Sequence, residues 1–79
     1  MNVVKKKIKS EYYEAVCSGK KKFELRKDED DIQEGDVLLL YEVKDGSPTG
    51  RSVKKTATYV LRNVPEYGLK EGYCIISIV

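Results

Sequence analysis

Residues 19–26 read Gly-Lys-Lys-Lys-Phe-Glu-Leu-Arg and join a helical pattern to a strand pattern. The apolar positions of residues 10–17 recur at helical spacing, and Gly19 suits the C′ position, where a left-handed backbone conformation ends a helix. A strand is predicted to follow over Lys21–Lys27. This junction decides the fold, because it sets where the helix ends and which face of the next strand enters the core.

Side chains alternate between the two faces of a strand. Lys22, Glu24 and Arg26 are therefore expected on one face, and Phe23 and Leu25 on the other. We expect the apolar pair to enter the core. The charged face is then either solvated surface, with Glu24 and Arg26 as an ordinary ion pair, or the floor of a binding cleft.

The rest of the chain predicts one helix and four further strands, with Ser10 as the N-cap of the helix. The last strand is apolar on both faces and must be paired inside the sheet. Together the elements predict an α+β domain, residues 1–79, built as a small five-stranded β-barrel or curved mixed sheet with one short α-helix after the first strand. The predicted strands outside Lys21–Lys27 are Asn2–Lys9, Val37–Val43, Arg51–Arg62 and Tyr73–Val79, with a loop over Lys44–Gly50.

Composition excludes several classes of protein. The 79 residues suit one domain, and 41% hydrophobic with 35% charged residues is typical of a folded chain. The longest apolar run, Val37–Tyr41, is far shorter than the roughly 18 residues of a membrane span. Met1–Lys9 lacks the apolar segment of a secretory signal, so no membrane association and a cytoplasmic location are expected.

The ionisable residues limit the available chemistry. Fifteen basic and thirteen acidic residues give a net charge of +2, with most basic residues between positions 5 and 27. There is no histidine, and Cys17 and Cys74 form no Cys-x-x-Cys pair, so no metal and no other cofactor is expected. Both cysteines are predicted to be buried free thiols.

The pattern Gly19-x-Lys21-x-x-Glu24-x-Arg26, directly after a short helix, resembles the GxKxxExR signature of the ASCH domains in the PUA-like superfamily. The Thr49-Gly50-Arg51 hairpin and the segment 67–73 also look like a small bacterial and phage branch of that group, whose function is unknown. The resemblance implies a PUA-like β-barrel with a cleft beside the helix. It also implies that Lys21, Glu24 and Arg26 line that cleft and hold RNA or a nucleotide-like ligand.

The chemistry of these residues agrees with such a ligand. Arg26 offers a planar fork and Lys21 a point charge for phosphate, while ionised Glu24 can accept from an exocyclic amino group of a base. The sequence therefore predicts an RNA-binding or nucleotide-binding module. Its expected binding residues are Lys21, Glu24, Arg26, Lys22, Lys20 and Gly19, with Tyr12 and Tyr67 as possible stacking surfaces.

Two alternatives stay open. The first is a hydrolase of a modified nucleoside or of RNA, although Glu24 occupies the position of the threonine nucleophile of related amidohydrolases. The second is a small accessory factor that binds a protein partner through the acidic Asp28–Asp31 segment or an exposed strand edge.

Overall fold

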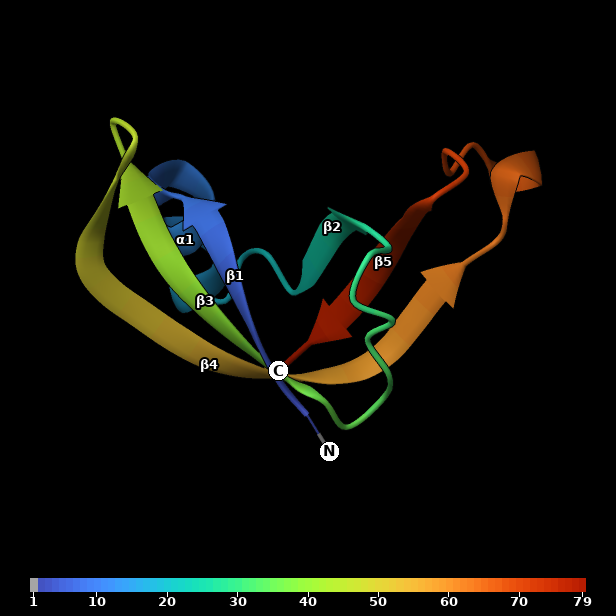
Figure 1. Cartoon of the computed structure of the whole chain (residues 1–79), viewed down its shortest axis with the longest axis horizontal. Coiled ribbons are helices and arrows are strands. Elements are labelled where there is room, and N and C mark those ends of the chain that lie inside the picture. The colour runs from blue at the N-terminus through green and yellow to red at the C-terminus, as the bar shows by residue number, and fades with distance from the viewer. Residues whose placement is uncertain (1) are drawn as a thin grey trace.

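The computed structural model describes residues 2–79, which form a single mixed β-sheet with one α-helix and one short 3₁₀-helix (Figure 1). The strand order is β1-β3-β4-β5-β2. β1 pairs with β3 in parallel, and the other neighbouring strands are antiparallel. The elements are β1 (Val3–Lys9), α1 (Ser10–Cys17), β2 (Phe23–Lys27), β3 (Val37–Lys44), β4 (Ser47–Arg62), η1 (Pro65–Tyr67) and β5 (Tyr73–Ile78).

The long strand β4 belongs to both halves of the sheet. Its first part, through Thr56, pairs with β3, and its last part, from Ala57, pairs with β5. A register shift between Ala57 and Tyr59 marks the place where the pairing passes from one half to the other. In Figure 1 the two halves form the arms of a V, with α1 on the arm that contains β1 and β3.

The predicted α+β class, with five strands in a mixed sheet and a helix after the first strand, is confirmed, but the sheet does not close into the β-barrel that was the other expectation. β1 pairs only with β3 and β2 only with β5, so among the described strands these two are free edges. No backbone ladder joins them. The sheet is curved and open, and side chains span the gap between its edges.

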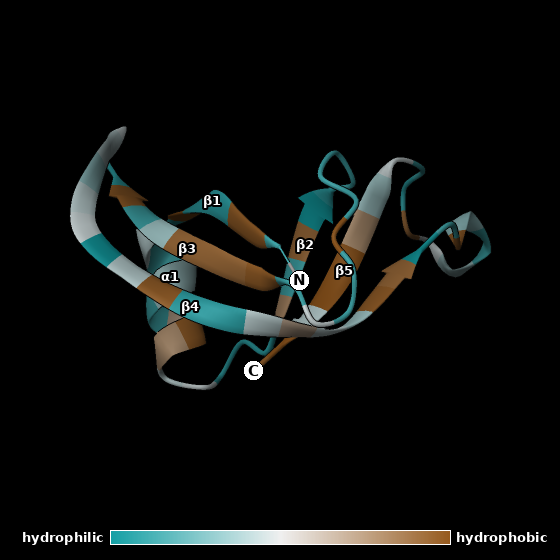
Figure 2. Cartoon of the chain, turned by 60° about the horizontal axis from the view of Figure 1, so that its bottom comes forward, coloured by the Kyte–Doolittle hydropathy of each residue, from teal (hydrophilic) through white to brown (hydrophobic). Residues whose placement is uncertain are grey.

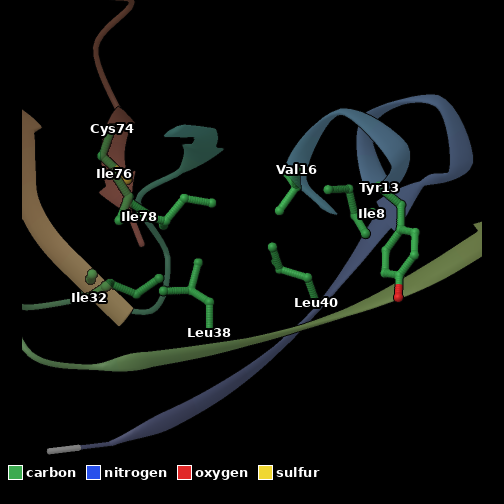
Figure 3. Close-up of a cluster of buried hydrophobic side chains, with 10 residues drawn as sticks. Ile8, Tyr13, Val16, Ile32, Leu38, Leu40, Cys74, Ile76 and Ile78 are labelled. Atoms are coloured by element: carbon green, nitrogen blue, oxygen red, sulfur yellow. The ribbon is translucent and has the colours of Figure 1, made fainter. Parts of the chain in front are cut away.

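The core lies between α1 and the concave side of the sheet. Figure 3 shows side chains from α1, β1, β3 and β5 pointing toward one another, with Ile32 contributed by the connection after β2. Hydrophobic residues run along β3 and β5, while the first half of β4 and the loops are mostly polar (Figure 2). As predicted, the apolar terminal strand is paired on both sides, by β4 and β2.

Local signals explain where α1 and β4 begin and end. Gly19, with φ +80°, ends the helix as predicted, and its N–H donates to Val16 O. The N-cap, however, is Lys9 and not Ser10, whose hydroxyl donates to Glu42 instead. The loop is shorter than the predicted Lys44–Gly50 and consists of the two residues Asp45 and Gly46. Both have positive φ, as a tight I′-type hairpin requires.

The structure reverses the predicted faces of β2. Glu24 is only 2% exposed, whereas Phe23 and Leu25 are 46% and 55% exposed. The reason is that two cations meet the Glu24 carboxylate inside the molecule and satisfy its oxygens, so burial leaves no unpaired charge. Cys74 is buried as predicted, but Cys17 is exposed. Within residues 2–79, no helix is long and apolar enough to cross a membrane.

Substitutions at Leu25 on β2 and at Ile76 on the neighbouring strand β5 test this reversal. Leu25→Ser should change the free energy of unfolding by less than about 0.5 kcal/mol, because the side chain is already largely in water. Ile76→Ala, at the fully buried position of β5 that faces Glu24 in the register, should cost about 2–5 kcal/mol. Urea denaturation followed by circular dichroism measures both. A large loss from Leu25→Ser would mean that Leu25 belongs to the core after all.

Candidate functional site

An open groove of about 910 Å³ lies where the end of β1, the start of α1, β2 and the β3–β4 turn meet. Its walls combine five cationic side chains with apolar and aromatic ones, and three carboxylates, those of Glu11, Glu24 and Asp45, also line it. A volume of this size is in the range of small-molecule binding sites. The lining residues that matter below are Lys7, Lys9, Tyr12, Lys21, Phe23, Glu24, Leu25, Arg26 and Lys44.

The groove is organised around the buried Glu24 carboxylate. Lys21 Nζ donates to Glu24 Oε1 at 2.6 Å, and Arg26 Nε donates to Glu24 Oε2 at 2.9 Å. Arg26 Nη2 is also 2.8 Å from Oε2. The side chains of the two cations are 17% and 18% exposed, so both remain accessible from the groove while held by the carboxylate.

Arg26 also connects the two free edges of the sheet. Its Nη2 donates to the backbone carbonyl of Lys7 on β1 at 2.8 Å. Further along, Lys6 Nζ pairs with Asp30 at 2.7 Å and Glu29 at 3.1 Å, in the segment after β2. The hydrogen bond from Lys6 to Asp30 raises the pKa of the Lys6 ammonium group. Side chains therefore do the bridging that backbone hydrogen bonds would do in a closed barrel.

Lys21 sits beside two aromatic rings at the groove wall. Its Nζ is 4.9 Å from the centroid of the Phe23 ring and 5.6 Å from that of Tyr12. It also donates to Phe23 O at 2.7 Å. These cation–π contacts fix the ammonium group between helix and strand.

Lys21 and Arg26 keep N–H groups that make no hydrogen bond within the described residues. Lys21 has three N–H groups and uses two of them, on Glu24 and Phe23. Over residues 2–79, Nη1 of Arg26 makes no hydrogen bond to protein, which leaves its two N–H groups available. Each Glu24 oxygen, in contrast, already accepts a hydrogen bond from one of these two cations.

The structure separates the predicted site residues into two sets. Lys21, Glu24, Arg26 and Tyr12 meet in the groove. The predicted residues outside its lining are Gly19, Lys20, Lys22 and Tyr67, the last of which is 84% exposed in η1.

The sequence analysis did not predict three of the lysines that line the groove. Lys7 and Lys9 lie at the end of β1, and Lys44 lies beside the hairpin turn. The alternation of Lys7 and Lys9 on a strand resembles ordinary edge protection, and Lys44 falls in a predicted loop, so the sequence alone gave no reason to place these lysines beside the signature.

A second buried carboxylate anchors the helix that forms one groove wall. Glu42 on β3 is 2% exposed and accepts hydrogen bonds from Ser10, Thr49 and Arg51. Arg51 also pairs with Glu14 on α1, and its guanidinium lies 4.9 Å from the Tyr13 ring centroid. These contacts join the first turns of α1 to β3 and β4.

The sequence did not identify this cluster as an anchor. The available signal was Glu42 itself, a single charge within the apolar strand Val37–Val43, in alternation with Leu38 and Leu40. A charge at a core-facing position needs an opposite charge beside it, and Arg51 nearby in the chain provides it.

Within residues 2–79, no group of three or more histidine, cysteine, aspartate or glutamate side chains is arranged to hold a metal ion. The groove lining carries ammonium, guanidinium and aromatic groups, together with the carboxylates of Glu11, Glu24 and Asp45. Cationic and aromatic groups bind and orient an anionic or planar ligand.

Comparison with known proteins gives two findings. The model of the family described as Domain of unknown function (DUF3850) matches residues 3–78. An "Uncharacterized 12.9 kDa protein in GpA 3'region" of Escherichia phage P2 is 39% identical over 54 residues, which are 68% of this chain. The aligned part is 50% of the phage protein, so the chain spans about half the length of this curated relative.

The Glu42 cluster predicts an acid-sensitive stability. Hydrogen bonds, above all from Arg51 and then from Thr49 and Ser10, lower the pKa of Glu42 from 4.5 to about 2. A lowered folded-state pKa gives stability that is complete above the unfolded pKa and is lost as protons bind. Wild-type protein should therefore lose stability as the pH falls from about 4.5 to about 2.

Urea midpoints across this pH range, for wild type and Glu42→Gln, measure the effect. The variant should be less stable at pH 7 and should show a shallower pH dependence. Some dependence of stability on pH should remain in the variant, because backbone N–H groups of Gln33 and Asn2 donate to Asp36 and also lower the pKa of that carboxyl. Glu34→Gln, at an exposed position, should keep the wild-type slope. An unchanged slope in Glu42→Gln would contradict the assignment.

Proposed function

The chain belongs to the family described as Domain of unknown function (DUF3850), and we propose that it is a binding module for nucleic acid or a nucleotide, with RNA as its first candidate ligand. The observation that carries the proposal is the pair of cations on Glu24. Lys21 and Arg26 are fixed by the buried carboxylate, yet keep N–H groups that face an open groove. Preorganised donors of this kind bind phosphate or a base edge with little further ordering.

The rest of the groove supports the same ligand class. Lys7, Lys9 and Lys44 add positive charge around its lining, where they can neutralise a few phosphates. Tyr12 is 45% exposed and presents an aromatic surface on the helix side. Because bases stack on such a ring only when they are unpaired, a single strand fits the groove better than a duplex.

We propose further that the fold is an open variant of the ASCH and PUA-like architecture. The signature residues Lys21, Glu24 and Arg26 do lie in a cleft beside the helix, which agrees with what the resemblance implies. The missing ladder between β1 and β2 is the difference from a closed barrel, and the contact from Arg26 to Lys7 takes its place.

The contacts of Glu24 favour binding over catalysis. A general base needs an oxygen that can receive a proton from substrate, and both Glu24 oxygens already accept from cations. The proposal therefore assigns Glu24 a positioning role: it holds Lys21 and Arg26 in place.

Variants that spare the Glu24 ion pairs test the proposal without risk to the fold. Fluorescence anisotropy with a labelled single-stranded RNA should show Tyr12→Ala weakening binding by about 5- to 100-fold, the range expected for one lost base stack. Lys9→Ala should weaken it and reduce the slope of log K against log salt by about 0.7, the value for one phosphate contact on a single strand.

Matched controls come from the same chain. Tyr67→Ala removes an exposed tyrosine outside the groove lining, and Lys54→Ala removes an exposed lysine of β4 outside it. Both should bind like wild type. Equal losses from Tyr12→Ala and Tyr67→Ala, or no RNA binding at low salt, would reject the groove as a nucleic-acid site.

A further inference from the structure

The backbone of β2 presents a free edge to the groove. Ile78 N donates to Lys22 O, and Asp28 N donates to Gly72 O, so the backbone groups of Lys22 and Asp28 point toward β5. Backbone direction alternates along a strand. The N–H and C=O groups of Phe23, Leu25 and Lys27 therefore point away from β5, toward the open side.

The backbone of β1 presents a second free edge on the opposite side of the groove. Lys7 O accepts from Arg26, which comes from β2, so the backbone groups of Lys7 point away from β3. By the same alternation, those of Lys5 do too, whereas the C=O of Lys9, the N-cap of α1, belongs to the helix. Two edges with unpaired backbone groups thus face a common opening.

Basic side chains cap these edges only in part. Arg26 donates to Lys7 O and Lys21 donates to Phe23 O. Ammonium and guanidinium groups cannot accept a hydrogen bond. The outward N–H groups of the edges, such as that of Leu25, are left to an acceptor from elsewhere, and the backbone of an added strand supplies such acceptors in a row.

The side chains beside the edges indicate the composition of that strand. Lys5, Lys7 and Lys9 are exposed along β1, and Lys27 is exposed at the end of β2. Lysines on an edge oppose pairing with a second copy of the same basic edge, whereas carboxylates opposite them are favourable cross-strand neighbours. Phe23 and Leu25 leave apolar surface uncovered on β2.

We propose that an extended acidic segment of a partner protein adds to the β2 edge as an extra strand. Its backbone pairs with Phe23, Leu25 and Lys27. Its outward side chains include both apolar residues, which cover Phe23 and Leu25, and carboxylates, which lie near the lysines of β1, because these exposed residues share the outer face of the sheet. The proposal rests on the free edges and on the lysines beside them. It does not depend on nucleic-acid binding, although both ligands would use the same groove.

A short fluorescein-labelled peptide of the repeat Val-Ser-Glu-Ser, which places valine and glutamate on the same face of a strand, serves as the probe in fluorescence anisotropy. Two further versions carry backbone N-methyl groups at the odd or at the even positions, which keeps all charges and removes one set of N–H donors. Strand addition predicts that at least one version binds about tenfold or more weakly, since it loses several backbone hydrogen bonds. Equal binding of all three peptides would overturn the proposal, because charge alone would then explain the affinity.

On the protein side, Leu25→Pro removes one outward N–H group and no hydrogen bond of the sheet, so an edge strand should tolerate it. Leu25→Ala is the matched control, since it loses the side chain but keeps the N–H group. Leu25→Pro should bind the peptide about fivefold more weakly than Leu25→Ala. Equal peptide affinities for the two variants would contradict strand addition.

Amide hydrogen exchange gives a readout that needs no variant. In the free protein the Phe23, Leu25 and Lys27 amides should exchange quickly, and the peptide should slow them, while single-stranded RNA should not. Unchanged exchange at saturating peptide would overturn the proposal. Peptide protection without any RNA binding would support this inference and reject the nucleic-acid function, so the two can fail separately.

Discussion

The ion pairs of the buried Glu24 carboxylate are the interaction on which the rest of the structure depends. A lone buried carboxylate is costly, and here one cation on each oxygen offsets that cost. Because Glu24 occupies the inner face of β2, Phe23 and Leu25 must face outward. The same carboxylate places Arg26 where it reaches Lys7 on β1, and Lys21 where it meets the rings of Tyr12 and Phe23.

One set of contacts therefore serves both fold and site. Arg26 spans the two free edges in place of a ladder, and the opening that it spans is the groove. The anchor at Glu42 has a similar form on the other side of the groove, since it satisfies a buried carboxylate with Arg51 and two hydroxyls and thereby ties α1 to the sheet. In both places a charged strand residue faces the core, and an arginine within nine positions of it in the chain completes its contacts.

Sequence reasoning predicted the element order, the helix end at Gly19, the paired terminal strand and the meeting of Lys21, Glu24 and Arg26, because glycine conformation, strand periodicity and the signature spacing are local signals. It failed on the faces of β2. Periodicity assigns the apolar residues inward by default, and only knowledge that two cations surround Glu24 reverses that choice. It also missed Lys7, Lys9 and Lys44, whose place in the groove depends on how distant strands come together. The open sheet edge is a long-range property of the same kind.

The most direct test of the central claim is a double-mutant cycle between Glu24→Gln and Arg26→Gln, with unfolding free energies from urea denaturation. If Glu24 and Arg26 act as a buried pair, Glu24→Gln removes the counter-charge of Arg26, and Arg26→Gln leaves Glu24 Oε2 without its cation while Lys21 stays on Oε1. The double variant should then be more stable than the sum of the single losses predicts. The expected coupling is about 1–3 kcal/mol. A coupling within about 0.3 kcal/mol of zero would mean that the two side chains stabilise the fold independently, and the account of β2 and its groove would be wrong.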